Sequence, residues 1–358
     1  QAGIVGLPNV GKSTLFNALT KKGVPAQNYP FCTIDPSVGI VAVPDDRLHK
    51  LADFSKTLKT IPAVVEFVDI AGLVKGASKG EGLGNKFLAN IRECNAILHV
   101  LRCFDDDNII HVDGNVNPVR DKEIIDTELQ LKDLEAVEAK LKKFEKAGKL
   151  GNDKEAVKTY SACSKLKETL ESGKSARACV LEDSELPFIQ DLHLLTIKPV
   201  MYVCNVDEAS AKTGNKYVDA VREAIKGEGA ELLVITAAME SEISSLETYE
   251  EKQMGLDEPG VNKLIKQAYS LLKLQTYFTA GVKEVRAWTI EKGMTAPQAA
   301  GVIHTDFEKG FIRAEVIGYN DYVTYGSENA CKEVGKLRVE GKEYVVADGD
   351  VMHFRFNV

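Results

Sequence analysis

The most informative segment of the sequence is Gly6-Leu7-Pro8-Asn9-Val10-Gly11-Lys12-Ser13. It matches the pattern G-x-x-x-x-G-K-[S/T] in full, after a short apolar run and before a helical run, Thr14–Thr20. In this strand–loop–helix context, the glycines let backbone N–H groups close around phosphate oxygens, and the helix N-terminus favours negative charge. The stretch therefore predicts a P-loop that binds a nucleoside triphosphate.

The P-loop residues have separate expected roles. Lys12 is expected to reach the β- and γ-phosphates, and the hydroxyl of Ser13 to bind Mg²⁺. The rest of the phosphate cradle is expected from Asn9, Val10, Gly11 and Thr14.

A second motif, Asp69-Ile70-Ala71-Gly72, stands at the end of the apolar run Val64–Val68. In this order after a P-loop, Asp69 would supply a carboxylate on the Mg²⁺ side, and Gly72 an N–H group for the γ-phosphate. Thr33 lies between the two motifs and would complete the Mg²⁺ shell through its hydroxyl. Without the other motifs, Thr33 reads equally well as an ordinary loop threonine.

The expected base-recognition segment is Asn205-Val206-Asp207-Glu208, where a GTPase normally carries N-K-x-D. Glu208 is one methylene longer than Asp, which moves its carboxylate away from the two guanine donors. Val206 replaces the Lys that covers the base. A site that misplaces such a contact pair loses its discrimination, so the segment favours ATP over GTP. Thr236 and Ala237 stand where a loop is expected to contact the edge of the base. The alternative to a base-site role for Asn205 is that its side chain only caps the end of the preceding strand.

Composition and charge narrow the class of protein. The chain has 358 residues, 27% of them charged, and a net charge of −8, so it is no polycation built to coat nucleic acid. No apolar run approaches the roughly 18 residues of a membrane span. The seven cysteines form no C-x-x-C pair, which favours reduced thiols in a cytoplasmic protein.

Short apolar runs alternate with helical stretches in residues 1–117 and 198–273, which predicts a mostly parallel α/β sheet. The candidate strands there are Gly3–Gly6, Val38–Val43, Val64–Asp69, Ala96–Leu101, Pro199–Cys204 and Leu232–Thr236. Residues 274–358 differ and predict a compact α+β domain. Its candidate strands are Val285–Ile290, Ile312–Ile317, Tyr344–Val346 and Val351–Phe356.

Residues 118–197 predict an antiparallel helical hairpin inserted in the α/β domain. Apolar residues there repeat at helical spacing on two arms that meet at the turn Gly148–Asp153. The seam residues are Leu134, Val137, Leu141 and Phe144 on the first arm, and Val157, Tyr160, Cys163, Leu166 and Leu170 on the second. The alternative is one amphipathic helix packed on the core, against which the dense charge on both arms argues.

In this order, the motifs Gly6–Ser13, Asp69–Gly72 and Asn205–Glu208 resemble the YchF subfamily of Obg-related P-loop (TRAFAC) proteins, the Obg-like ATPases. The resemblance covers essentially the whole chain and implies a Ras-like G domain (1–117 and 198–273) with a coiled-coil insertion (118–197). The segments Gln275–Thr279 and Phe307–Glu315 resemble the TGS domain of that family, which implies a ubiquitin-like β-grasp fold for residues 274–358.

The resemblance also implies function. It implies an ATPase that associates with ribosomes, through the large subunit, and in which the nucleotide controls conformation. Neither a membrane nor sequence-specific DNA is an expected partner. Two rivals stay open: a nucleotide-gated ribosome- or RNA-binding module with incidental turnover, and a conventional GTPase.

The hydrolytic step departs from the Ras pattern at Leu73, where Ras-type proteins carry a water-orienting Gln. Leu cannot hydrogen-bond water, so hydrolysis is expected to be slow unless another group holds the water. The resemblance implies His111 as that group; the alternative is a loop histidine without a catalytic task. Asn9 occupies the position that helps to bind K⁺ in related K⁺-dependent P-loop proteins, and its alternative is an ordinary polar loop residue.

Overall fold

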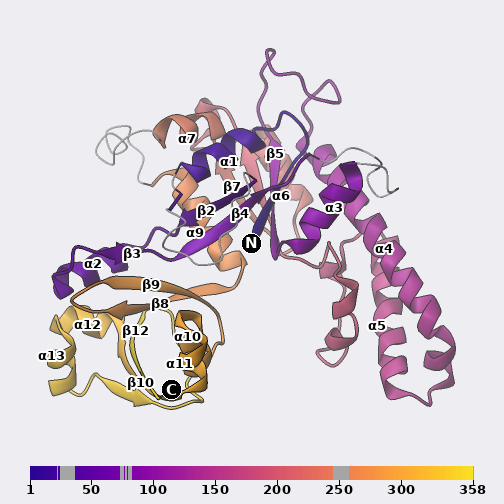
Figure 1. Cartoon of the computed structure of the whole chain (residues 1–358). Helices are drawn as coiled ribbons and strands as arrows, with labels where there is room; N and C mark the ends of the chain where they lie inside the picture. Colours follow the sequence, from indigo (N-terminus) through magenta and orange to yellow (C-terminus); the bar gives the residue numbers. More distant parts are fainter. Residues whose placement is uncertain are drawn as a thin grey trace. The chain divides into compact units, whose positions relative to one another are not determined.

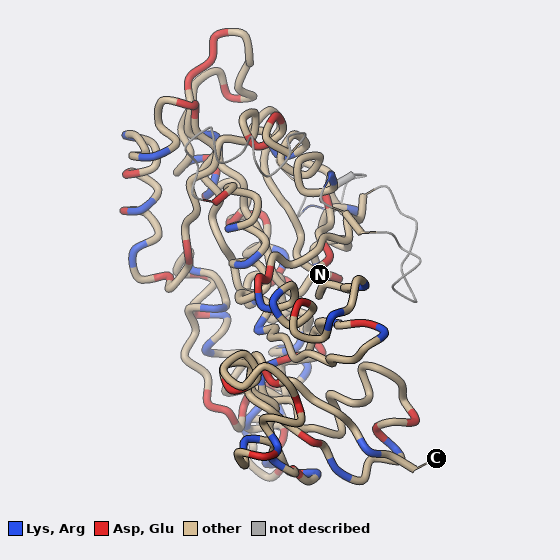
Figure 2. The backbone as a smooth tube through the Cα atoms, turned by 90° about the vertical axis from the view of Figure 1, so that its left-hand side faces the viewer, with Lys and Arg blue, Asp and Glu red and all other residues tan. Residues whose placement is uncertain are grey.

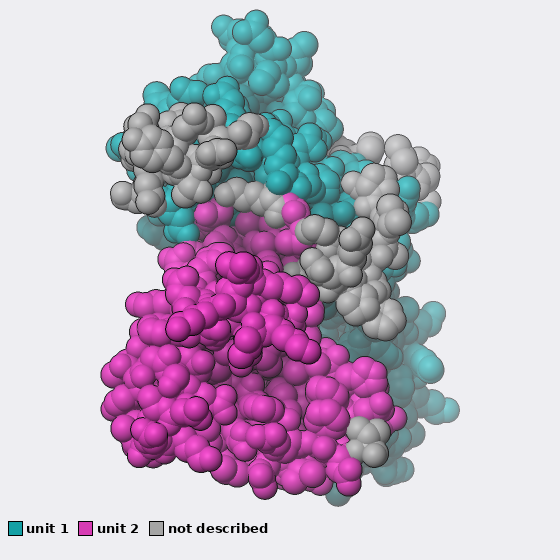
Figure 3. Space-filling model, turned by 60° about the vertical axis from the view of Figure 1, so that its left-hand side comes forward, with its two compact units in different colours: residues 1–21, 34–39, 66–261 teal, residues 22–33, 40–65, 262–358 magenta. Residues whose placement is uncertain are grey.

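The computed structural model in Figure 1 describes residues 1–21, 23–24, 37–72, 76, 79, 83–244 and 258–357. Thr33, Leu73 and Cys32 lie outside these residues. The chain divides into two compact units, residues 1–21, 34–39 and 66–261, and residues 22–33, 40–65 and 262–358 (Figure 3). No helix in the described part of the chain is long and apolar enough to cross a membrane. The six described cysteines are free thiols.

The first sheet has six strands in the order β2-β4-β1-β5-β6-β7. They are β1 (Ala2–Val5), β2 (Val38–Ala42), β4 (Val64–Asp69), β5 (Ala96–Arg102), β6 (Val200–Asn205) and β7 (Glu231–Ile235). β1 pairs in parallel with β4 and β5, and β6 with β5 and β7. Every residue of β1, β5 and β6 is buried, as expected for the centre of a parallel sheet covered on both faces. All six predicted strands of this sheet are confirmed to within about two residues.

Helices cover both faces of this sheet (Figure 1). α1 packs against α7 on one side, and α4 packs against α6 and β5 on the other. The helices of this part of the chain are α1 (Lys12–Thr20), α3 (Leu83–Glu93), α4 (Pro118–Leu150), α5 (Lys154–Glu171), α6 (Lys216–Ala224) and α7 (Ala237–Ile243). α9 (Gly260–Leu271) begins at the boundary between the two units.

α4 and α5 form the predicted hairpin. The Asn117 side chain caps α4 by accepting from Arg120 N at 3.1 Å, and Gly151, with φ 73°, ends it. The turn is therefore shorter than predicted, because the helix continues through Gly148. A Cβ on Gly148 would lie 2.5 Å from the Cβ of Tyr160, so glycine is needed for the arms to approach this closely.

The core of the hairpin differs in part from the predicted seam. Val137, Cys163, Leu166 and Leu170 are buried as predicted, but Val157 is 36% exposed. Ala162, one position before Cys163, is buried instead. Short 3-10 segments that follow α5 close the rest of this core through Ala176, Ile189 and Leu194.

The second sheet has the order β11-β10-β12-β8-β9-β3. Its strands are β3 (Thr60–Ile61), β8 (Leu274–Ala280), β9 (Val285–Glu291), β10 (Phe311–Gly318), β11 (Arg338–Glu340) and β12 (Asp350–Phe356). β8 and β9 form an antiparallel hairpin, while β12 runs parallel to β8 and antiparallel to β10. The helices of this unit are α2 (Asp46–Ser55), α10 (Ala296–Ile303), α11 (Thr305–Lys309), α12 (Tyr319–Tyr325) and α13 (Glu328–Glu333). This mixed sheet, with α10 against its core, is the β-grasp arrangement.

The predicted strand Tyr344–Val346 is wrong. The segment forms a single bridge, between Val345 and Thr295. Its backbone instead bonds to residues at and just before the start of α10, since Ala296 N donates to Tyr344 O at 2.8 Å and Val346 N donates to Met294 O at 3.0 Å. The strand β8 and the helix α2 were not predicted.

His99 in β5 gives the folded state a pH-dependent stability. Its side chain is buried, and its Nε2 has no hydrogen-bond partner among the residues that the structure describes. Burial, with a smaller contribution from the positive charges of Lys122 and Arg177, lowers the pKa of His99 to about 3. Because the pKa of an unfolded histidine is about 6.5, the unfolded chain binds more protons between these values. The stabilisation is complete above pH about 6.5 and is lost as the pH falls towards 3.

We therefore expect the free energy of unfolding to fall by about 2 kcal/mol between pH 7 and pH 5 through His99 alone. Urea unfolding at both pH values, with the parent and His99→Phe, checks this. The variant should show a shallower pH dependence, whereas His49→Phe, at an exposed histidine of α2, should behave as the parent. An unchanged pH dependence in His99→Phe would contradict the prediction.

Candidate functional site

The P-loop connects β1 to α1, and Gly11 is the N-cap of α1. Gly11 has φ 93°, a left-handed conformation, and a Cβ there would lie 2.1 Å from Asn205 Nδ2. Only glycine fits both conditions. Because glycine has no side chain, it cannot cap the first N–H groups of the helix, and these N–H groups are suited to an anion.

Lys12 and Asp69, from motifs far apart in the sequence, form an ion pair in the structure. They meet because β1 and β4 are neighbours, with Ile4 paired to Asp69 in the parallel ladder. Their side chains are 11% and 25% exposed, so the pair lies at the edge of the interior. Gly72 lies against the same loop, because a Cβ added to it would be 3.8 Å from Gly6 O. Ser13 and Thr14 are exposed at the start of α1.

Asn205 joins the P-loop to the predicted base loop. Its Nδ2 donates to Val10 O at 2.9 Å, and its Oδ1 accepts from Ala237 N at 2.9 Å. The side chain is buried, with both ends satisfied. Asn205 therefore does more than cap a strand, since it fixes the P-loop relative to the N-terminus of α7.

The other residues of the base segment divide between interior and surface. Glu208 is exposed, while Asp207 caps the following turn by accepting from Ser210 N at 2.9 Å. Val206 is 2% exposed, and its N–H donates to Ile235 O at 2.9 Å. The Val206 side chain therefore lies in the interior, unlike a lysine laid over a base. Thr236 and Ala237 are also buried.

His111, in the loop before α4, is buried against Asp121 in the first turn of that helix. Its Nε2 is 2.7 Å from Asp121 Oδ2, and its Nδ1 accepts from Asp113 N at 3.0 Å. An Nδ1 that accepts from a backbone amide leaves the proton on Nε2, which donates to the carboxylate. Arg120 bonds the other oxygen of Asp121. Both ring nitrogens are therefore engaged, and neither points to open solvent.

The loop that precedes His111 contacts the P-loop. Asn9, which has φ 64°, donates from Nδ2 to Ile110 O at 3.0 Å. The buried guanidinium of Arg102 holds this loop by donating hydrogen bonds to the carbonyls of Phe104, Asp106 and Ile109. Sequence reasoning missed Arg102, although a charged residue at the end of an otherwise apolar strand was a usable signal. Asp121 was also missed; an acidic residue in a first helical turn is too common to single out.

Proteins of known family match the whole chain. The "Ribosome-binding ATPase YchF" of Haemophilus influenzae is 56% identical over 362 residues, which cover 100% of this chain and 99% of the relative. The protein of the same name from Bacillus subtilis is 57% identical over 364 residues, with the same coverage. The chain belongs to the YchF family. A YchF structure from Schizosaccharomyces pombe, described as a GTPase, matches with a TM-score of 0.89 at 42% identity, over 99% of this chain and 97% of that one.

Two family models match parts of the chain. The model described as "50S ribosome-binding GTPase" matches residues 1–142. The model for the C-terminal part of YchF GTPases, described as "Protein of unknown function (DUF933)", matches residues 274–357. Together with the YchF structure, they confirm the predicted fold class: a Ras-like P-loop domain with a helical insertion and a C-terminal β-grasp domain. The names of these YchF relatives differ over the nucleotide, ATPase for the bacterial proteins and GTPase for the yeast one.

Proposed function

We propose that this chain is a Mg²⁺-dependent P-loop ATPase that hydrolyses ATP to ADP and phosphate and acts as a nucleotide-controlled, ribosome-binding switch in the cytoplasm. The observation that carries the proposal is the pairing of Lys12 with Asp69 beside the uncapped N–H groups of α1. The bacterial relatives named ribosome-binding ATPases, identical at more than half of the aligned positions, support the rest.

The proposed roles follow the chemistry of each group. Lys12 binds the β- and γ-phosphates in place of its contact with Asp69, and the N–H of Gly72 faces the γ-phosphate. Ser13, Thr33 and Asp69 offer the hard oxygen ligands that Mg²⁺ prefers. When bound, Mg²⁺ would neutralise charge on the phosphates. Asn9 is the proposed contact for a K⁺ ion.

The proposed preference for ATP depends on Glu208. Its side chain is exposed beside the segment that Asn205 fixes to the P-loop, where it is free to meet a base. A glutamate there displaces the carboxylate that the two guanine donors need, whereas adenine presents one donor, at N6, and an acceptor at N1. Val206, Thr236 and Ala237 contribute the wall of the base site from the interior.

The structure offers a route from the nucleotide site to the hairpin. Glu128 of α4 accepts from Gly76 N at 2.8 Å, shortly after the Asp69–Gly72 motif, and Asp121 of α4 contacts His111. These two acidic residues are seven positions apart, about two turns, and so lie on one face of α4. Movement of either loop on nucleotide binding would therefore act on the helix that carries the hairpin.

We also propose that the chain has three domains, formed by residues 1–117 with 198–273, by residues 118–197 and by residues 274–358.

We propose that the hairpin of α4 and α5 contacts the large subunit of the ribosome. Acidic and basic residues are interspersed along the chain (Figure 2), so a contact with ribosomal RNA requires a local group of basic side chains. Lys142 and Lys146, exposed and one helical turn apart near the tip of α4, offer such a group.

We expect Lys142→Glu combined with Lys146→Glu to weaken cosedimentation with large ribosomal subunits about tenfold or more, and to reduce its salt dependence. The matched control reverses two exposed lysines outside the hairpin, Lys86 and Lys226. ATP affinity should be unchanged in both variants. Equal binding by the hairpin variant and the control would contradict the assignment of the hairpin as the contact surface.

A nucleotide-gated binding module with incidental turnover is the second candidate, because Leu73 replaces the water-orienting Gln. Single-turnover hydrolysis of ATP with and without ribosomes separates the two. An enzyme should show a rate that ribosomes or K⁺ raise well above the basal value, whereas a module should bind ATP with the same slow turnover throughout.

A further inference from the structure

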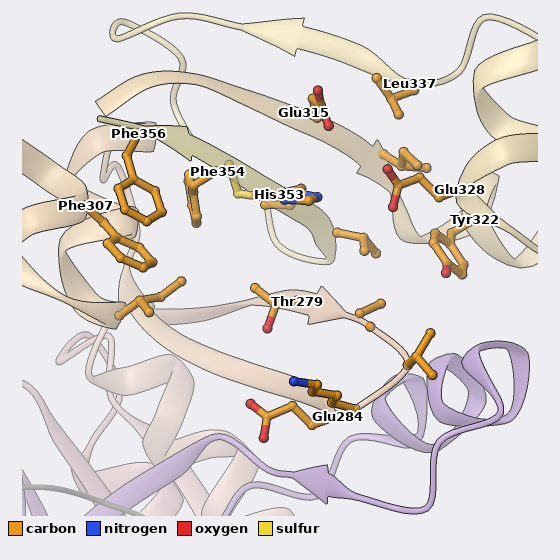
Figure 4. Close-up of a pocket in the computed structure, with 18 residues that line it drawn as sticks. Thr279, Glu284, Phe307, Glu315, Tyr322, Glu328, Leu337, His353, Phe354 and Phe356 are labelled. Atoms are coloured by element: carbon orange, nitrogen blue, oxygen red, sulfur yellow. The ribbon is translucent and has the colours of Figure 1, made fainter. Parts of the chain in front are cut away.

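The C-terminal β-grasp unit contains a cleft that the proposed nucleotide chemistry does not use. Its volume is about 460 Å³, within the range of specific ligand sites. Figure 4 shows it between β12, which carries His353, Phe354 and Phe356, and the end of β8, which carries Thr279. The turn Gly281–Glu284 and residues of α10 to α13 complete its walls.

One wall of this cleft is an unpaired strand edge. β12 pairs with β10 along its whole length, from Asp350 to Phe356. On its other side, the described residues of β12 pair with β8 at one position only, Val351 with Phe278. β8 then ends at Ala280, and Gly281 N donates to Glu284 O at 3.0 Å as the chain turns into β9. Among the residues that the structure describes, residues 352–356 therefore pair with no strand on the side of the cleft, and such edges are templates for strand addition.

The cleft offers apolar surface at both of its ends (Figure 4). The rings of Phe307 and Phe356 stack with centroids 3.8 Å apart, and Phe356 is 39% exposed. Ile317 and Tyr322 line the opposite part of the cleft, and Val282 is 87% exposed at the turn. A strand inserted along β12 would therefore meet apolar side chains at both of its ends.

The charges in the cleft favour a basic partner. Glu315, Glu328 and His353 bring their polar atoms within 4.8 Å of one another. Glu315 is paired with Arg355 at 3.3 Å, but Glu328 makes no ion pair with the residues that the structure describes. Lys283 is the one lysine or arginine among the lining residues, against three glutamates. A Lys or Arg side chain entering the cleft would therefore find an unused carboxylate beside the backbone edge.

We propose that this cleft binds an extended basic segment of a partner protein by strand addition to the edge of β12. Main-chain hydrogen bonds to residues 352–356 give affinity, the apolar side chains at the two ends of the cleft contact the ends of the segment, and Glu328 with Glu315 selects a Lys or Arg. This binding activity is separate from the nucleotide site and does not depend on the proposed ATPase function.

The probe is an acetylated and amidated peptide, Val-Thr-Val-Arg-Val-Thr-Val, titrated into the full chain by calorimetry. Two matched peptides carry Glu in place of Arg, or N-methyl groups on alternate backbone nitrogens. We expect saturable binding of the Arg peptide, binding of the Glu peptide weaker by about tenfold or more, and no binding of the N-methylated peptide. Hydrogen exchange should slow at amides within residues 352–356 when the Arg peptide is bound.

Variants of the chain locate the site. Glu328→Gln should weaken binding of the Arg peptide about tenfold, and Thr279→Trp, which fills the cleft, should abolish it. Glu333→Gln, at an exposed glutamate of the same helix, should bind as the parent. Lys12→Ala should also bind the peptide as the parent, which separates this proposal from the nucleotide function. Thermal unfolding confirms that each variant is folded.

Three results would overturn the proposal. The first is no saturable binding of the Arg peptide to the folded parent chain. The second is equal binding of the Arg, Glu and N-methylated peptides, which would show non-specific adsorption. The third is binding of Zn²⁺ that Glu328→Gln removes, without peptide binding, which would make the Glu315–Glu328–His353 cluster a metal site.

Discussion

Replacing Lys12 with Ala is expected to lower ATP hydrolysis about a thousandfold, or to abolish it. The side chain is 11% exposed and already faces the Asp69 carboxylate, so it is placed before the nucleotide arrives. Its loss removes the main positive charge that faces the β- and γ-phosphates, where charge develops during transfer. Single-turnover hydrolysis and equilibrium binding of ATP measure the two parts of the effect.

The matched control for this experiment is Lys86→Ala, at an exposed lysine of α3. It should hydrolyse ATP at the parent rate. Because Lys12→Ala leaves the Asp69 carboxylate without its partner, thermal unfolding of the variant should be measured as well. The double variant Lys12→Ala with Asp69→Asn removes that unpaired charge and serves as a control for stability. Parent-like hydrolysis in folded Lys12→Ala would show that the P-loop is not the catalytic site.

Replacing His111 with Ala is expected to lower turnover about a hundredfold while ATP affinity changes little. Such a result requires the imidazole to leave its contacts with Asp121 and Asp113, which engage both ring nitrogens in the structure. ATP binding supplies a reason for this movement, since the neighbouring Ile110 carbonyl is bonded to Asn9 of the P-loop.

Asp121→Asn tests the same idea from the other side. If His111 must be released, a weaker acceptor at position 121 should leave turnover intact or raise it, whereas His111→Ala lowers it. If His111 only anchors its loop to α4, both variants should lose thermal stability to a similar degree and hydrolyse ATP normally. That second pattern would contradict a catalytic role for His111.

The parts of the fold that depend on local patterns were predictable. A P-loop needs its glycines at fixed spacing, and buried parallel strands need continuous apolar runs, so Gly6–Ser13 and strands such as Ala96–Leu101 are visible in the sequence. The order of the motifs predicts that Lys12 and Asp69 serve the same nucleotide site, but the ion pair between them is visible only in the structure.

Features set by tertiary contacts were not predictable. Tyr344–Val346 is apolar enough for a strand, but its backbone groups form hydrogen bonds with residues at and just before the start of α10. The sequence predicts that Val206 faces the nucleotide, but its side chain is buried and its N–H donates to Ile235 O of the neighbouring strand β7. The cluster of His111 with Asp121 joins a loop to a helix, and no spacing rule in the sequence announces it.

The preference of the chain for ATP can be measured by a competition between ATP and GTP for the parent chain, with Mg²⁺ present and repeated with ribosomes. We expect ATP to bind about tenfold or more tightly than GTP, because the Glu208 carboxylate is misplaced for the guanine donors. Glu208→Asp should reduce the ratio of ATP affinity to GTP affinity. It is tested without Val206→Lys, because a lysine at this buried position would place a charge in the interior. Equal or tighter binding of GTP by the parent chain, with or without ribosomes, would contradict the account.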